Sequence, residues 1–142
     1  YLTMRRWIPL LLVLLAAMSV RAATFEARLI RATNEPGARD EQLRSIEAKL
    51  KKQFGYEYYR QIGCGKTALD NTTRRLYLGE GFTLFVTSRG SRNQAQELHL
   101  ELYAGKAAVA KMPARLAPRG LLFAGPIRVG NDWLVLALQV VE

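Results

Sequence analysis

Residues Glu97–Tyr103 read ELHLELY, and this stretch decides the fold class. Leu98, Leu100 and Leu102 alternate with charged or polar side chains, which is the period of a strand that buries one face and exposes the other. The C-terminal run 133–141 is apolar at nearly every position, so we expect a strand with both faces covered. Together the two stretches predict a β-rich domain.

Further short strands are predicted before and after this stretch in the sequence, and turn residues separate them. Gly125-Pro126 is expected to form a turn before the last strand, and 88–93 is expected to form a basic loop. The remaining strands are predicted at 24–29, 59–69, 75–78, 82–87, 107–116 and 121–123.

The hydrophobic period changes after Asp40. Apolar residues recur there at intervals of three and four, which predicts an amphipathic helix over 40–54 with a stripe formed by Leu43, Ile46, Leu50 and Phe54. Asp40 is a good N-cap, and Gly55 can adopt the left-handed conformation that ends a helix. Glu47 and Lys51 are spaced to form an ion pair on the helix surface.

The order of these elements predicts the architecture. We expect a mainly β (α+β) domain, either an antiparallel β-sandwich or a rolled barrel of about seven to eight strands with one packed amphipathic helix. The narrow apolar stripe indicates that the helix packs on a sheet and leaves its other face in solvent.

The N-terminal residues 1–22 have the composition of a secretory signal peptide. Arg5 and Arg6 place positive charge before an apolar run, and Ala22 offers a small residue at the expected cleavage position. The apolar run is about half of the roughly 20 residues that a spanning helix needs, so we expect cleavage and no transmembrane helix afterwards. The remainder, 23–142, is then a single β-rich domain that is periplasmic or secreted.

Charge and cysteine content limit the expected partners. The chain has 21 basic and 12 acidic residues, and removal of the signal leaves a net charge of about +6. Outside the cytosol nucleic acid is not an expected ligand, whereas acidic proteins, anionic lipid headgroups and anionic glycans are. Cys64 is the single cysteine, which excludes an internal disulfide, and we expect it to be buried in a strand.

Short motifs follow the predicted helix and precede the last strand. They are Phe54-Gly55-Tyr56, Tyr59-Arg60, Gly63 and Gly125-Pro126. In these motifs, and over most of the mature domain, the chain resembles small exported bacterial proteins of unknown function. Ala124 stands where that group usually has a second glycine. The resemblance implies the fold and the compartment, and it implies no activity.

Two stretches have residue types that could support chemistry. The run 63–67, GCGKT, has Arg60 where a phosphate-binding loop has its first glycine, so we expect no bound nucleotide. Glu97, His99 and Glu101 project from one face of a strand and could approach a divalent ion, which leaves a metal-dependent hydrolase centred on His99 as an alternative. Three ligands from one strand converge poorly, so a solvated strand face is favoured, with no catalytic residues and no cofactor.

Arginines near the turns form the remaining candidate site. If the turns at one end share a rim, their guanidinium groups suit phosphate or carboxylate, and the exposed ring of Tyr58 could stack on a sugar or a protein. The arginines are Arg74, Arg75, Arg89, Arg92, Arg115 and Arg119. The favoured function is a non-enzymatic envelope accessory or interaction domain that binds a protein partner through its exposed strand and turn surface. The rim as a binder of anionic lipid or glycan is the first alternative.

Overall fold

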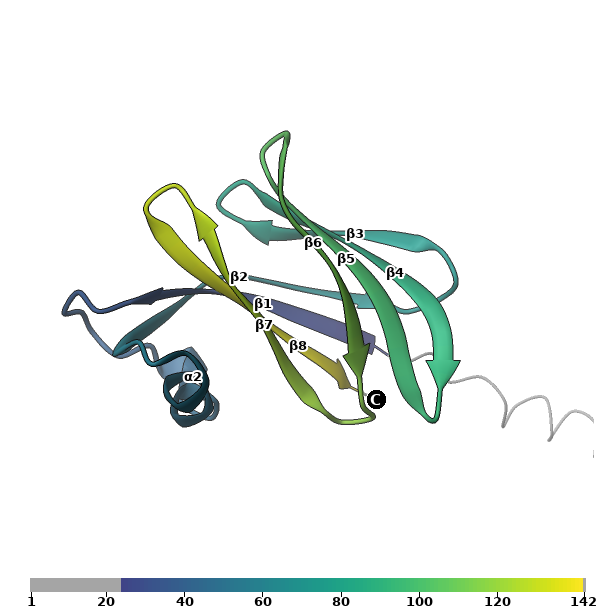
Figure 1. The fold of residues 1–142 in the computed structure, drawn as a ribbon, viewed down its shortest axis with the longest axis horizontal. Helices are drawn as coiled ribbons and strands as arrows, with labels where there is room; N and C mark the ends of the chain where they lie inside the picture. Colours follow the sequence, from purple (N-terminus) through teal and green to yellow (C-terminus); the bar gives the residue numbers. More distant parts are fainter. Residues whose placement is uncertain (1–23, 142) are drawn as a thin grey trace, which may run out of the picture.

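The computed structural model describes residues 24–141, which form two four-stranded antiparallel sheets and one helix (Figure 1). The first sheet has the order β2-β1-β8-β7, with β2 Tyr58–Ala68, β1 Thr24–Thr33, β8 Asp132–Val141 and β7 Leu121–Val129. The second sheet has the order β3-β4-β5-β6, with β3 Thr73–Gly79, β4 Phe82–Arg92, β5 Ala95–Ala104 and β6 Ala107–Leu116. The predicted antiparallel sandwich with one packed helix is confirmed. The predicted signal peptide and its cleavage position Ala22 lie outside the described residues.

The main core lies between the two sheets. From β5, Leu98, Leu100 and Leu102 point into it, as the alternating sequence predicts, and each is at most 2% exposed. Strand β8 lies between β1 and β7, and both of its faces are covered. Leu136 joins the core between the sheets, whereas Val135 belongs to a second apolar cluster under the helix. The prediction of a closing strand buried on both faces is therefore confirmed.

The predicted helix over 40–54 is divided in the structure, which corrects its expected length. Asp40 caps a short 3-10 turn, η2 Glu41–Leu43, and the α-helix α2 begins at Glu47 and ends at Phe54. Asp40 also binds the first sheet, because its Oδ2 accepts a hydrogen bond from the backbone N–H of Gln61 at 2.8 Å. This second bond holds the first turn against the sheet.

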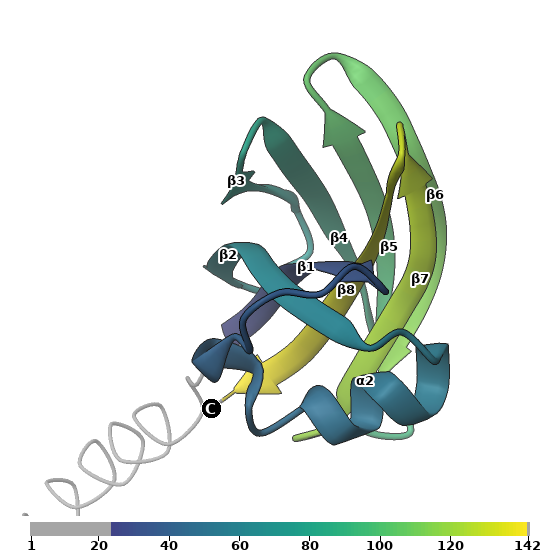
Figure 2. The ribbon, with the colours of Figure 1, turned by 90° about the vertical axis from the view of Figure 1, so that its left-hand side faces the viewer.

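The division of the helix does not disturb its apolar stripe. Leu43, Ile46 and Leu50 are all buried on the outer face of the first sheet. Gly55 ends the helix in the left-handed conformation, with φ of 80°, as expected. The predicted pair of Glu47 and Lys51 is also present, with an Nζ–Oε1 distance of 3.3 Å. Figure 2 shows α2 lying across the first sheet, on the side away from the second sheet.

The two sheets approach each other closely where β2 meets β3. A Cβ atom on Gly63 would lie 1.5 Å from the carbonyl oxygen of Leu78, so no other residue fits without movement of the strands. Gly65 faces the side chains of Leu76 and Leu78. Because the glycines occupy the inward positions here, the residue between them points outward. Cys64 is therefore exposed, and the prediction that it is buried is wrong.

Two predicted loop segments belong to strands. Residues 88–93 were expected to form a loop, but β4 continues to Arg92 with an irregular register between Ser88 and Ser91. Gly125-Pro126 was expected to form a turn, but it lies within β7, where the register with β8 shifts between Ala124 and Ile127. In both places an irregularity in the register bends the strand without ending it. Glycine, proline and other turn residues occur both in such irregularities and in turns, so the sequence pattern does not distinguish a bent strand from a turn.

Candidate functional site

The outer face of the second sheet presents a group of aromatic side chains. Tyr77 from β3 is 71% exposed, and Phe85 from β4 and Tyr103 from β5 are half-buried beside it. The rings of Phe85 and Tyr103 meet edge to face, with centroids 5.4 Å apart. The guanidinium carbon of Arg75 lies 5.7 Å from the ring centre of Tyr77. We call these four residues the aromatic face.

Local sequence explains why these side chains point outward. Their neighbours in the strands, such as Leu76, Leu84 and Leu102, fill the core between the sheets, so the alternate positions face the other way. Cross-strand pairing then brings Arg75 opposite Phe85. The sequence predicted Tyr103 to be outward, but it gave no reason to group it with residues on β3 and β4.

The predicted metal alternative at His99 lies beside the aromatic face. The structure places His99 Nε2 3.6 Å from Glu101 Oε2, and Lys111 Nζ lies 3.5 Å from the other oxygen of Glu101. Glu97 lies further along β5, opposite Arg115. Over the described range 24–141, no group of three or more His, Cys, Asp or Glu side chains could hold a metal ion. The hydrolase alternative stays a prediction without supporting geometry.

The structure brings together only part of the predicted arginine rim. Arg89, Arg92 and Arg115 gather where β4 turns into β5, and Arg115 Nη2 lies 3.4 Å from the backbone carbonyl of Arg92. Arg89 and Arg115 line a hollow of about 640 Å³. Arg119 lies in the turn between β6 and β7, and Figure 1 shows both turns at the same end of the molecule. We call Arg89, Arg92 and Arg115 the arginine cluster.

The other members of the predicted rim lie elsewhere. Arg74 pairs with Asp70, and hydrogen bonds from Thr72 and Arg74 lower the pKa of Asp70 to about 2. Arg75 belongs to the aromatic face. Tyr58 lies at the opposite end of the first sheet from the arginine cluster, at the start of β2. The six arginines and Tyr58 therefore do not form one surface.

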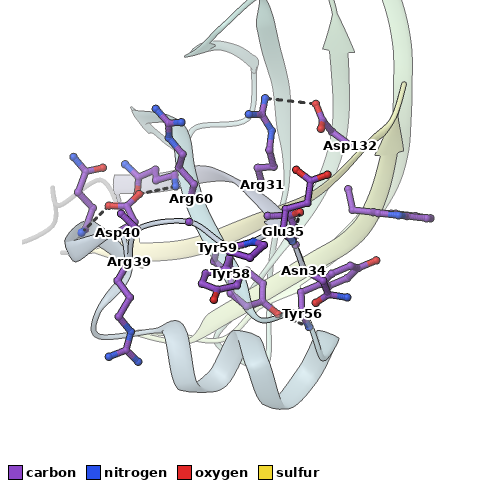
Figure 3. Close-up of a pocket in the computed structure, with 18 of the residues that line it drawn as sticks. Arg31, Asn34, Glu35, Arg39, Asp40, Tyr56, Tyr58, Tyr59, Arg60 and Asp132 are labelled. Carbon is purple, nitrogen blue, oxygen red and sulfur yellow. Dashed lines mark hydrogen bonds and ion pairs between the residues drawn. The ribbon is translucent and has the colours of Figure 1, made fainter.

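Tyr58 lines an open groove at the end of the first sheet, drawn in Figure 3. Its walls are the loop after β1, the first residues of β2 and the turn between β7 and β8, and its volume is about 850 Å³. We call it the end groove. Its lining includes Arg31, Asn34, Glu35, Asp40, Tyr56, Tyr58, Arg60, Gln61, Asp132 and Trp133.

Hydrogen bonds fix the floor of the end groove to the helix. Tyr59 is buried, and its hydroxyl donates to the carbonyl of Leu50 at 3.0 Å and accepts from the N–H of Tyr56 at 3.2 Å. Burial raises the pKa of Tyr59, so the hydroxyl keeps its proton. Tyr59 and Tyr56 both pack in the apolar cluster at the end of the helix.

Two polar atoms in the wall of the end groove have no partner. Arg31 Nε and Gln61 Oε1 are buried and make no hydrogen bond within 24–141. Arg31 Nη2 does have ionic contacts, at 3.5 Å to Asp132 and 3.6 Å to Glu80. The pairing of β1 with β2 places Arg31 and Gln61 on opposite faces of the first sheet, and no local pattern in the sequence indicates that either atom is buried without a partner.

The exposed thiol of Cys64 has an environment that suppresses reactivity. Partial burial raises its pKa, and the neighbouring carboxylate of Glu26 raises it further. Glu26 itself is buried, which favours its protonated form, but hydrogen bonds from Lys66 and Arg28 outweigh this and lower its pKa below 4.5. A thiol that stays protonated is a weak nucleophile.

Comparison with known proteins adds no relative: no family model, no curated protein and no solved structure matches the chain. The resemblance to small exported bacterial proteins therefore stays a prediction. Within 24–141, no helix has the length and apolar character that a membrane-spanning segment requires.

Proposed function

We propose that this chain is an exported, non-enzymatic accessory domain of the cell envelope that binds a protein partner through its aromatic face. The observation behind the proposal is the cluster of Tyr77, Phe85, Tyr103 and Arg75 on a sheet face that no described element covers. Tyrosine and arginine are among the residue types that are enriched where protein–protein affinity is concentrated.

The geometry of the aromatic face suits a protein contact. Phe85 and Tyr103 fix each other's orientation, so little side-chain entropy is lost when a partner covers them. Tyr77 stands out from the sheet and can enter a pocket on the partner. The strands beneath are held by ladder hydrogen bonds and by the core, so the surface is formed before binding.

The charge of the aromatic face supports one class of partner over others. Among the described residues no carboxylate lies within ion-pair distance of Arg75, whereas Glu101 is already matched by Lys111. The free positive charge on this face, and the net charge of about +6 that remains after removal of residues 1–22, favour an acidic partner. We therefore expect an apolar side chain of the partner flanked by aspartate or glutamate.

A photo-crosslinking amino acid at position 77 tests the proposal. In intact cells we expect crosslinks to one acidic envelope protein from this position, and none from a matched probe at the exposed position 53 on the helix. With that partner purified, Tyr77→Ala should weaken binding by about tenfold or more, as expected of a central tyrosine. Tyr58→Ala, in the end groove, should leave the affinity unchanged.

Either of two results would overturn the proposal. One is equal crosslinking from positions 77 and 53. The other is recovery of the chain in the cytosol with its N-terminal residues 1–22 still attached, because the expected partners are outside the cytosol.

The arginine cluster supports a second candidate function, the binding of anionic lipid or glycan. Within the described part of the chain, Arg89, Arg92 and Arg115 have no carboxylate at ion-pair distance, so their charges are available to a ligand. Vesicles with anionic headgroups should bind at low ionic strength and lose most of the protein at physiological salt. Substitution of Arg89 and Arg115 by glutamine should abolish this binding, and salt-independent binding would contradict it.

A further inference from the structure

We propose that the hollow beside the arginine cluster binds a phosphoethanolamine headgroup, in which a phosphate and an ammonium group are joined by a short chain. The inference rests on the second candidate function, the binding of lipid, and it names the headgroup. The hollow has a volume of about 640 Å³, which lies in the range typical of sites for small ligands. Its lining includes two arginines and one glutamate, Arg89, Arg115 and Glu97.

Strand pairing places the glutamate and one of the arginines on the same face of the second sheet. Glu97 of β5 lies opposite Arg115 of β6, and residues paired in this way point to the same side of a sheet. Leu98 follows Glu97 and points into the core, so Glu97 and Arg115 lie on the outer face. Arg115 is exposed and Glu97 is half-buried, so a ligand in solvent can reach both side chains.

An irregularity in β4 brings the second arginine to the other side of the glutamate. The register between β4 and β5 is irregular from Ser88 to Ser91. Arg89 and Gly90 lie opposite Glu97 alone, which is the two-to-one arrangement of a β-bulge. Gly90 has φ of 99°, a conformation that glycine adopts readily. Because Ser88 is buried and Arg89 is exposed, Arg89 points to the outer face. The glutamate therefore has an arginine on each neighbouring strand.

These three charges are not matched by one another. Within 24–141, neither Arg89 nor Arg115 has a carboxylate at ion-pair distance, and Glu97 has no cation at that distance. Arg115 Nη2 lies instead 3.4 Å from the backbone carbonyl of Arg92, which directs the guanidinium toward the turn between β4 and β5. The hollow therefore offers separate positive and negative groups to a ligand.

The imidazole in the same hollow does not neutralise Glu97. His99 lines the hollow, but its Nε2 lies 3.6 Å from Glu101 Oε2, on the side of the aromatic face. Glu101 also has Lys111 Nζ at 3.5 Å from its other oxygen. The carboxylate of Glu97 is thus the one in the lining that has no cationic neighbour among the described residues.

A ligand that carries both charges matches this arrangement. Guanidinium groups bind phosphate oxygens, often through two parallel hydrogen bonds. A phosphate alone would lie beside the like charge of Glu97, whereas an ammonium group donates hydrogen bonds to that carboxylate. Phosphoethanolamine presents both groups at short separation, so one molecule can satisfy the glutamate and the arginines that flank it.

The place of the hollow favours a lipid as the source of this headgroup. The turn between β4 and β5 and the turn between β6 and β7 lie at the same end of the molecule (Figure 1). Arg92, at the end of β4, and Arg119, in the turn after β6, are both exposed there. They can contact neighbouring phosphates of a membrane surface while one headgroup occupies the hollow. Free phosphoethanolamine would use the hollow alone.

Vesicle binding by the chain, purified in its exported form, tests the inference. The probes are vesicles of phosphatidylcholine alone and vesicles with added phosphatidylethanolamine or phosphatidylglycerol. Phosphatidylcholine has the same phosphate and the same net charge as phosphatidylethanolamine, but its methylated ammonium has no N–H to donate. We expect phosphatidylethanolamine to increase the affinity about fivefold over phosphatidylcholine alone at physiological salt, as expected for one hydrogen bond to a charged group.

Variants assign this preference to the hollow. Glu97→Gln should remove it, so that the two lipids bind alike, and should strengthen binding of phosphatidylglycerol because a carboxylate that repels phosphate is gone. Arg89→Gln should weaken binding of both phosphatidylethanolamine and phosphatidylglycerol. Glu57→Gln is the matched control, since it makes the same change of charge at an exposed carboxylate just before β2, and it should keep the preference. All of these side chains are accessible, so the variants should unfold in urea like the wild type.

Several results would overturn the inference. They are equal affinity of the wild type for phosphatidylethanolamine and phosphatidylcholine, a preference that persists in Glu97→Gln, and a preference that is lost in Glu57→Gln. NMR with free phosphoethanolamine and free phosphocholine separates the sources, and a preference among the free compounds without one among vesicles would overturn the assignment to a lipid.

Failure of this inference can be told apart from failure of the functions on which it builds. Salt-sensitive binding of phosphatidylglycerol without a preference for phosphatidylethanolamine would retain the second candidate function and reject the headgroup. Absence of binding to every vesicle would reject both. None of these results bears on the partner crosslinked from position 77.

Discussion

The two sheets of this sandwich differ in what covers their outer faces. On the first sheet, Ile30, Val135 and Ala137 form an apolar cluster with Leu50 of α2, and the helix covers it. On the second sheet, Phe85, Tyr103 and Tyr77 lie on the outer face with polar and charged neighbours, and no helix within 24–141 covers them. One face therefore uses its apolar groups for stability, whereas the other keeps aromatic groups accessible, which is what a binding surface requires.

The largest expected effect comes from the place where the sheets join. In Gly63→Ala the new Cβ would overlap the carbonyl oxygen of Leu78, which belongs to the rigid backbone of β3. We expect a loss of about 3 kcal/mol or more in the free energy of unfolding, measured by urea denaturation. Gly37→Ala is the control, since nothing lies within 4 Å of its Cβ position. Similar stabilities for the two variants would contradict the close approach of β2 and β3.

The covered face should respond to loss of its helix contact. Leu50 is fully buried between α2 and the first sheet, so Leu50→Ala leaves a cavity that the sheet cannot fill. We expect destabilisation of about 2–5 kcal/mol in the same urea experiment. A loss below about 1 kcal/mol would mean that α2 does not stabilise the sheet that it covers.

A smaller, pH-dependent effect is expected at Glu26, on the same outer face of the first sheet. Its pKa is lowered by Lys66 and Arg28, so its contribution to stability is present above the ordinary value of 4.5 and is lost as the pH falls through the lower folded value. Glu26→Gln should therefore cost about 1 kcal/mol at neutral pH. The difference from wild type should shrink below pH 4.5. A difference that stays constant in acid would contradict the ion pairs.

The smallest effect on stability is expected on the uncovered face. Tyr77 is 71% exposed, so Tyr77→Ala should change the free energy of unfolding by no more than about 0.5 kcal/mol. The same variant should lose most of its affinity for the protein partner. Marked destabilisation by Tyr77→Ala would mean that the two faces have the same role and would remove the contrast between them.

Much of the fold could be predicted because its signals are local. The alternation over Glu97–Tyr103 and the stripe that contains Leu50 each lie within one element, and β6 begins and ends at the predicted residues 107 and 116. The environment of Cys64 could not be predicted in this way. It depends on the approach of β3 to the glycines of β2, and that contact joins residues that no local period connects.

The candidate sites were less predictable for the same reason. The sequence correctly placed His99 and Glu101 on one strand face, but it grouped Tyr58 of the first sheet with arginines that lie in the second sheet or in the turn after β6. Arg31 and Gln61 drew no attention, because an arginine and a glutamine in strands are ordinary residues until pairing and burial show that one atom of each has no partner.

The position of Cys64 also bears on how the chain can fold. It is the single cysteine in the sequence, and its side chain lies at the surface, outside both apolar clusters. Folding therefore needs no oxidation step and no disulfide exchange, and the domain should reach the same native state in the presence or absence of a reducing agent. Because the pKa of the Cys64 thiol is raised, attachment of a maleimide dye needs an alkaline pH, and the attached dye would lie outside both apolar clusters.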